Sequence, residues 1–196
     1  MSGSSEKVAA VHIAAGLLLL QDCDVTADAG CAVLVTGTAA PRIAGNRVKT
    51  ASTWGLELTG ESKPICVKNT VRGGESGGVL CAEKCAATLE KNTLKENGGP
   101  GCLVKDSAAP RVQENEVTNN LGAGLEAAGA SAPVLLRNRI WGGQAQGLWL
   151  HDSSKAAGEG NVIFANKGDQ VCVEAGKTEG SLSSRILYVS QIKEWK

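Results

Sequence analysis

The chain of 196 residues has few aromatic side chains and no net charge. Phe, Tyr and Trp make up 3% of the sequence, so Val, Leu and Ile must fill most of the interior. Lys plus Arg and Asp plus Glu both number 20, so no overall electric field draws the protein to nucleic acid or to a membrane surface. Neither is therefore expected as a partner.

Long hydrophobic runs are also scarce. Residues 8–20 form one apolar stretch, but a histidine interrupts it and it is too short for a transmembrane helix. Glu6 and Lys7 make a poor basic start for a secretory signal, which stays open as the less favoured alternative. Val11 and Ile13 instead indicate an incomplete first coil, out of phase by one residue, that caps the N-terminal end.

A fixed 23-residue repeat is the dominant signal in the sequence. A constant period of this length is typical of solenoids and propellers, and it outweighs local propensity. Asparagine recurs at this spacing with no insertion, at Asn46, Asn69, Asn92, Asn115, Asn138 and Asn161.

Four further positions of each repeat are almost always apolar. In one example, Leu56 and Leu58 flank an outward Glu57, which is the alternation of a strand. No segment keeps a 3.6-residue period long enough for a helix. The sequence therefore predicts an all-β fold, a parallel β-helix of about seven 23-residue coils.

The asparagine column predicts a structural ladder with no catalytic role, because a buried amide at a bend can bond to the amide of the next coil. Glycine recurs nine residues after each of the first five asparagines and predicts either a positive φ or a close approach of two chain segments. These glycines are Gly55, Gly78, Gly101, Gly124 and Gly147.

The motif Asn-x-hydrophobic, followed by Gly-hydrophobic-x-hydrophobic, covers residues 18–178 and resembles the right-handed parallel β-helix repeat family, the pectate-lyase-like superfamily. This superfamily includes polysaccharide lyases, hydrolases and epimerases. It also includes the carbohydrate-binding-like β-helices of F-box and SHC-binding proteins, which the short, regular coils resemble most. The resemblance implies one domain, with residues 1–17 as an N-terminal tail and cap, 18–178 as the β-helix and 179–196 as a C-terminal cap. The alternative for the last segment is the start of further sequence in a longer protein.

The sequence departs from the enzymes of that superfamily in two respects. Pectate lyases hold calcium in a carboxylate cluster beside an Arg base, and polygalacturonases group Asp residues on one sheet. Here no outward column stacks two acidic residues in adjacent coils beside an Arg. The constant coil length also leaves no long loops to wall a substrate cleft.

The chain has seven cysteines. Cys66, Cys81 and Cys102 fall in apolar columns and are expected as small core residues, whereas Cys31 and Cys85 fall on turn or outward positions. Cys81 and Cys85 are closely spaced, but no second pair or His cluster accompanies them, so no metal and no other cofactor is expected. The odd number of thiols indicates a reducing compartment, the cytoplasm.

Outward positions of one sheet carry Lys49, Arg72 and Lys95 in successive coils, and the column continues to Trp141. We call these three cations the basic strip. Like charges stacked about 4.8 Å apart repel each other, so the stacking has a cost. The strip is either a solvated edge that Glu90, Glu114 and Glu116 partly neutralise, or a docking face for an acidic protein surface or anionic polymer.

A second outward column contains Leu80, Leu103 and Trp149, which we call the apolar row, with Glu126 between Leu103 and Trp149. An exposed apolar row is hard to explain in an isolated monomer. It is expected to be covered by a terminal segment of the chain or by a partner protein.

Candidate catalytic residues are His151, Asp152 and Asp106, beside Glu126 and Trp149. They predict an acid/base cleft with two Asp residues separated by two coils, roughly 9.6 Å, which suits an inverting carboxylate pair. Both Asp residues, however, start turns, where Asp is common for backbone reasons. The sequence therefore favours a non-catalytic scaffold that binds other proteins within a larger assembly. The alternative is a carbohydrate-binding or polysaccharide-processing β-helix.

Overall fold

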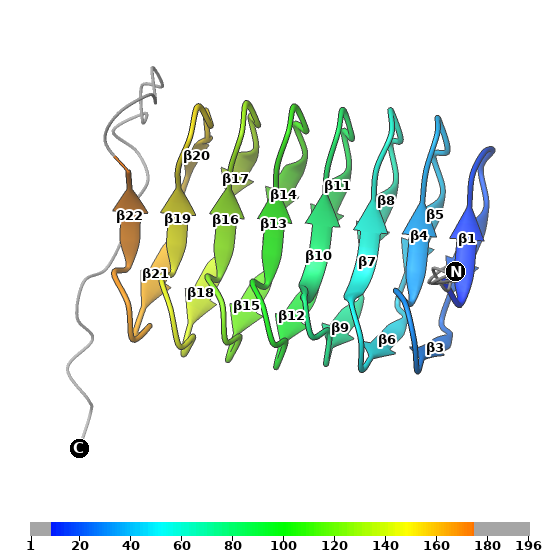
Figure 1. Ribbon diagram of the computed structural model, residues 1–196, viewed down its shortest axis with the longest axis horizontal. Coiled ribbons are helices and arrows are strands. Elements are labelled where there is room, and N and C mark those ends of the chain that lie inside the picture. The colour runs from blue at the N-terminus through cyan, green and yellow to red at the C-terminus, as the bar shows by residue number, and fades with distance from the viewer. Residues whose placement is uncertain (1–8, 175–196) are drawn as a thin grey trace, which may run out of the picture.

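The computed structural model describes residues 9–174, which wind into a parallel β-helix of three sheets (Figure 1). Each full coil contributes one short strand to each sheet, and neighbouring strands belong to successive coils. Within these residues there is no α-helix, and so none that could cross a membrane. The predicted all-β solenoid is confirmed. The predicted C-terminal cap, 179–196, lies outside the described residues.

Sheet A has eight strands, and sheets B and C have seven each. Sheet A consists of β1 (Val11–Ile13), β4 (Val33–Val35), β7 (Trp54–Leu58), β10 (Gly77–Cys81), β13 (Cys102–Val104), β16 (Leu125–Ala127), β19 (Leu148–Leu150) and β22 (Val171–Val173). Sheet B consists of β2 (Leu19–Gln21), β5 (Arg42–Ala44), β8 (Ile65–Val67), β11 (Thr88–Glu90), β14 (Arg111–Gln113), β17 (Val134–Leu136) and β20 (Ala157–Glu159). Sheet C consists of β3 (Asp24–Ala27), β6 (Arg47–Thr50), β9 (Thr70–Arg72), β12 (Thr93–Lys95), β15 (Glu116–Thr118), β18 (Arg139–Trp141) and β21 (Val162–Phe164).

The strands keep the register that the sequence period dictates. Leu56 pairs with Val79, its equivalent in the next repeat, and every other strand pair keeps the same offset, with the exception of β1 and β4. There, Val11 pairs with Val33, an offset that is shorter by one position. The residues expected to form an incomplete first coil thus form a strand that is out of phase by one residue and extends sheet A.

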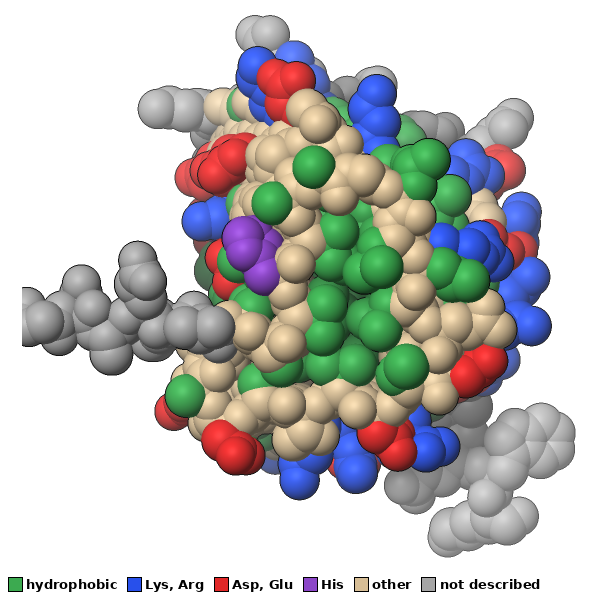
Figure 2. Space-filling view, turned by 90° about the vertical axis from the view of Figure 1, so that its right-hand side faces the viewer, with side chains coloured by type: hydrophobic (Ala, Val, Ile, Leu, Met, Phe, Trp, Pro, Cys, Tyr) green, Lys and Arg blue, Asp and Glu red, His purple; other side chains and the backbone are tan. Residues whose placement is uncertain are grey.

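The inward columns of the three sheets form one continuous apolar core. Leu56 of sheet A, Leu89 of sheet B and Ile140 of sheet C each expose 1% of their surface. Figure 2 looks onto the end of the rod near β1, where hydrophobic side chains gather in the middle and charged side chains lie at the rim. The outward positions therefore remain available for function.

The corner between sheets B and C is held by the predicted asparagine ladder. The side-chain oxygen of Asn92 accepts hydrogen bonds from the backbone N–H of Asn69, at 2.9 Å, and from its side-chain amide, at 3.0 Å. The side-chain amide of Asn92 donates to the Cys66 carbonyl at 2.9 Å and to the Asn115 side chain at 3.0 Å. Lys91, just before the ladder, has a φ of 53°, which turns the chain into the corner. The same four bonds recur at Asn69, Asn115 and Asn138, so the ladder satisfies buried polar groups along the rod.

The recurring glycines are explained by a close approach of two chain segments, the second of the two predicted reasons. None of the five has a positive φ. A Cβ on Gly124 would lie 2.3 Å from Cγ2 of Ile140 and 2.6 Å from the carbonyl oxygen of Gly147. Glycine is required here because core side chains and the next coil approach the backbone closely.

A second asparagine ladder, which the sequence did not predict, lies at the corner between sheets C and A. The side-chain amide of Asn97 donates to Asn120 at 2.9 Å, and that of Asn120 donates to the Leu94 carbonyl at 3.1 Å. Asn166 stands two coils after Asn120, and the intervening Gly143 donates its N–H to Asn166 at 3.0 Å. Glycines in this column obscure the period in the sequence.

One prediction about exposure is wrong, and two cysteines near turns are more buried than turn positions usually are. Cys31 follows a bend and Cys85 follows a turn, yet they expose 4% and 0% of their surface. Leu80 was expected to be exposed and exposes 6%. It lies between Glu57 and Leu103 in the ladder, and these outward neighbours help to cover it.

Candidate functional site

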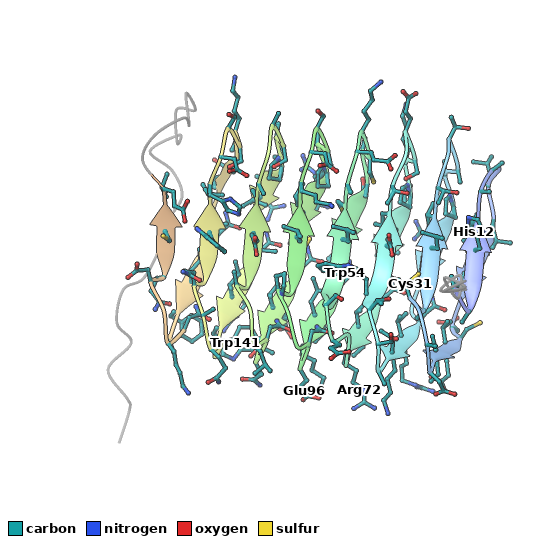
Figure 3. All side chains as sticks on the ribbon, viewed as in Figure 1. His12, Cys31, Trp54, Arg72, Glu96 and Trp141 are labelled. Carbon is teal, nitrogen blue, oxygen red and sulfur yellow. The ribbon has the colours of Figure 1, made fainter. Side chains whose placement is uncertain are left out.

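The basic strip lies on the outer face of sheet C. Lys49, Arg72 and Lys95 pair with one another in register on β6, β9 and β12. Figure 3 shows Arg72 projecting from the lower edge of the rod, on the side of sheet C. Parallel pairing at a constant offset stacks the three cations in adjacent coils.

The strip lines a shallow groove of about 390 Å³, together with Arg47, Thr70 and other residues of sheet C. Lys95 is balanced in part, because its Nζ lies 3.6 Å from Oε1 of Glu96. Within residues 9–174, no carboxylate oxygen lies within 4.0 Å of the side-chain nitrogens of Lys49 or Arg72. These two cations are therefore not paired within the described residues, although the edge as a whole is partly neutralised.

Asp24 balances a fourth cation at the N-terminal end of the groove. Nη2 of Arg47 lies 2.8 Å from Oδ2 of Asp24, and both side chains are exposed. The hydrogen bond from Arg47 holds the pKa of Asp24 below its usual value. Four cations thus share two carboxylates, Asp24 and Glu96, which leaves the groove two positive charges in excess.

The column of the basic strip ends in an aromatic pair. Trp141 and Phe164 stack with ring centroids 6.0 Å apart and planes 4° apart. The guanidinium carbon of Arg139 lies 5.8 Å from the centre of the Trp141 ring, within cation–π distance. Both rings are half-buried and continue the outward column of the basic strip, with one threonine between them and Lys95.

The neighbouring corner column behaves as a solvated, neutralised edge. Nζ of Lys91 lies 3.1 Å from Glu90 and 3.5 Å from Glu114, and Arg137 lies 2.9 Å from Glu114. The hydrogen bond from Arg137 and the charge of Lys91 hold the pKa of Glu114 below its usual value. These cations are occupied, unlike Lys49 and Arg72.

On sheet A, the structure brings together four of the residues considered for catalysis. Nε2 of His151 lies 3.1 Å from Oε1 of Glu126, and both side chains expose 17% of their surface. The His151 ring lies against Trp149, with centroids 4.4 Å apart, and its Nδ1 is 3.3 Å from Oδ2 of Asp152. We call these four residues the His151 cluster. It contains an acid/base pair, His151 and Glu126.

The two Asp residues serve their turns. Oδ2 of Asp152 accepts the backbone N–H of Gly129 at 3.0 Å, and Oδ2 of Asp106 accepts that of Glu83 at 3.1 Å. Their φ values are 56° and 60°, in the left-handed region that Asp tolerates. The register sets Asp106 two coils from His151, so Asp106 does not join the His151 cluster.

The apolar row is less exposed than the sequence suggested. Leu80 is buried, and Leu103 and Trp149 are half-buried. The indole N–H of Trp149 donates to Oε1 of Glu174 at 3.1 Å. The row therefore does not form a wide apolar surface over the described residues.

A groove around Trp54 was missed in the sequence. It has a volume of about 370 Å³ and includes Cys31, Leu34 and Glu57 in its lining. The signal was the equivalent residue of the next repeat: Gly77 pairs with Trp54 and has no side chain. A large ring opposite a glycine in adjacent coils marks a place where the ring can lie across the next strand.

Four buried cysteines, Cys66, Cys81, Cys85 and Cys102, lie near one another inside the rod. Contacts with Cys102 and Cys85, together with burial, raise the pKa of Cys81 well above its usual value. In the part of the chain that the structure describes, no group of three His, Cys, Asp or Glu side chains is arranged to hold a metal ion. These thiols act as small core residues.

Comparison with known proteins supports the fold. No curated protein matches the chain. Among solved structures, the chain is similar to a mutant of the periplasmic alginate epimerase AlgG, with a TM-score of 0.73 and 13% sequence identity. The similarity covers 88% of this chain and 51% of that one, so the chain spans about half the length of the epimerase. At this identity the likeness shows the fold alone.

A family model described as the right-handed β-helix region matches residues 4–138 and 54–186. The two overlapping matches cover nearly the whole chain, including all three sheets. The chain belongs to the right-handed β-helix family.

Proposed function

We propose that this protein is a non-catalytic β-helical scaffold whose basic groove on sheet C docks an acidic segment of another protein. The observation that carries the proposal is the pair of unbalanced cations, Lys49 and Arg72, in adjacent coils of one groove. Two like charges held in register destabilise the free protein, and an acidic partner relieves that repulsion.

The shape of the rod supports the same proposal. Coils of constant length present flat sides without walls, which suits an extended partner better than a small substrate that must be oriented and shielded from water. The groove runs across coils, so successive acidic side chains of a partner can meet successive cations. We place the protein in the cytoplasm, supported by its seven free cysteines.

A fluorescent polyglutamate peptide tests the proposal through its anisotropy on titration with the protein. We expect saturable binding that weakens as salt concentration rises. A double variant, Lys49→Glu with Arg72→Glu, should weaken binding by about tenfold or more. The matched control, Lys155→Glu with Lys167→Glu, changes the net charge equally at exposed sites away from the groove. Equal losses in both double variants would refute a specific groove.

A second candidate function is polysaccharide processing at the His151 cluster. The contact of 3.1 Å between His151 and Glu126, with the Trp149 ring beside it, is what favours this candidate. Turnover of polyuronates, followed by NMR of the sugar ring protons, provides the assay. Activity that His151→Ala or Asp152→Asn abolishes would replace the scaffold proposal, whereas the absence of turnover removes this candidate.

A further inference from the structure

The groove around Trp54 lies on the outer face of sheet A, separate from the basic groove on sheet C. Figure 3 shows Cys31 and Trp54 on the face of sheet A turned toward the viewer, whereas Arg72 lies at the lower edge. The lining of the groove around Trp54 comes from three successive coils: Cys31, Leu34, Thr53, Trp54, Glu57 and Ser76. None of these residues belongs to the surfaces discussed for acidic partners or for catalysis.

The indole of Trp54 has room to lie over the next coil because its partner in the sheet, Gly77, has no side chain. A Cβ on Gly77 would lie 2.3 Å from Cζ3 and 2.9 Å from Cε3 of Trp54, so the ring occupies the space above β10 that a side chain would fill. Gly77 also has a φ of 152°, which favours glycine. Trp54 is nevertheless only half-buried and lines the groove. One wall of the groove is therefore aromatic.

Glu57, further along β7, places a carboxylate in the same groove. Its side chain is half-buried, and within residues 9–174 no Lys, Arg or His nitrogen lies within 4.0 Å of its oxygens. Burial and the neighbouring Glu57 raise the pKa of Cys31 to about 11, so this thiol stays neutral. The groove thus carries one negative charge without a cation to balance it.

We propose that this groove binds an alkylammonium group, with its alkyl substituents against the Trp54 ring and Leu34 and its charge balanced by Glu57. A cation is attracted both by the ring face and by the carboxylate, and partial burial strengthens both attractions. A single carboxylate without further ligands does not suit a metal ion, and no cluster of three candidate ligands occurs among the described residues. The groove around Trp54 is negatively charged, unlike the basic groove on sheet C, so it does not suit the proposed acidic partner. The two proposals are therefore independent.

Titration with tetramethylammonium chloride, followed through the indole N–H signals in ¹H–¹⁵N NMR spectra, tests this site. Sodium chloride at equal ionic strength and tert-butanol, a neutral molecule of similar size, are the controls. We expect a saturable shift of the Trp54 indole signal, which is assigned by its loss in Trp54→Phe. Neither control should reproduce the shift.

Two variants with the same change of charge decide the role of Glu57. Glu57→Gln should weaken tetramethylammonium binding by about threefold or more, whereas Glu116→Gln, at an exposed position of sheet C, should leave it unchanged. Circular dichroism checks that both variants keep the β-helix. The proposal is overturned by equal affinity for tert-butanol, by unchanged affinity in Glu57→Gln, or by a saturable shift confined to another indole. Because acidic peptides are not used, its failure is distinguishable from failure of the scaffold proposal.

Discussion

Asn92→Ala should be among the most destabilising substitutions that remove only a few atoms. The Asn92 side chain takes part in four hydrogen bonds, exposes 2% of its surface and lies in the middle of the ladder. Truncation leaves the N–H of Asn69 and the carbonyl of Cys66 buried without these partners. At about 1 kcal/mol for each lost bond, the expected loss of unfolding free energy is about 4 kcal/mol.

The end of the ladder provides an internal comparison. Asn46 makes three such bonds, two of them only partly buried, so Asn46→Ala should cost less, about 2 kcal/mol. Gln113→Ala is the surface control, because this half-buried amide contacts only the Arg111 side chain among the hydrogen bonds of the described residues. Urea unfolding followed by far-UV circular dichroism gives all three values. The slope must be compared as well, because coils of a solenoid can unfold separately. A cost for Asn92→Ala no greater than that for Gln113→Ala would refute the reasoning.

Asn92→Asp keeps the shape of the side chain and tests the direction in which stability changes with pH. The introduced carboxylate can still accept from Asn69, but its second oxygen faces the acceptors on Cys66 and Asn115. Repulsion and burial raise the pKa of this carboxyl in the folded state. The folded state therefore binds its proton more tightly than the unfolded chain does, and the stability of the variant falls as pH rises from the unfolded to the folded pKa. Stability relative to the parent that is independent of pH across this window would contradict the ladder geometry.

Three further outcomes follow from the structure. Gly124→Ala should lower the unfolding free energy by about 2 kcal/mol or more, measured by urea unfolding, because the new methyl group would overlap Ile140 and the next coil; an unchanged midpoint would contradict the close approach. Exposed Cys23 should react with iodoacetamide at pH 8 well before buried Cys31, whose raised pKa keeps it protonated, as peptide mapping by mass spectrometry can show; the reverse order would contradict the burial assignment. Arg137→Ala should raise the pKa of Glu114 in a carboxyl NMR titration. The stabilising contribution of Glu114 is present above its unfolded pKa and is lost as pH falls through its lowered folded pKa, so the variant should show a weaker loss of stability in acid.

The fold could be predicted because its period appears in every coil. An inward position such as Val79 has an inward neighbour one coil away on each side, Leu56 and Cys102, and the same register recurs in all three sheets. A single odd residue, such as Cys66 in an apolar column, cannot hide such a pattern. Burial selects the residue type at these positions, so the sequence records it directly.

The second asparagine ladder shows where this reading of the sequence fails. At its corner, Gly74 and Gly143 replace the amide, yet their backbone N–H groups still donate to the asparagine of the next coil. The backbone therefore keeps the ladder continuous while the side-chain column is interrupted. A hydrogen bond made by the main chain does not depend on residue type, so the sequence alone could not predict the ladder at this corner.

The roles of outward residues are harder still to predict from the sequence. The repeat shows which face of the rod each residue lies on, but not which side chain or backbone group it contacts. The carboxylates at the corner after sheet A illustrate this. In successive coils a turn N–H points toward the equivalent residue of the next coil, and Asp106 and Asp152 both accept such a bond, from Glu83 and Gly129. The backbone carbonyl of His151, one residue before Asp152, accepts the N–H of Ser154 in this turn, which leaves the His151 side chain free to meet Glu126. Two adjacent residues that look like one catalytic pair in the sequence thus have different roles in the fold. A carboxylate at this corner is available for chemistry only if it loses its hydrogen bond to the backbone of the turn. Within the described residues, the cations of sheet C make no such bond, and they are therefore the stronger basis for a functional proposal.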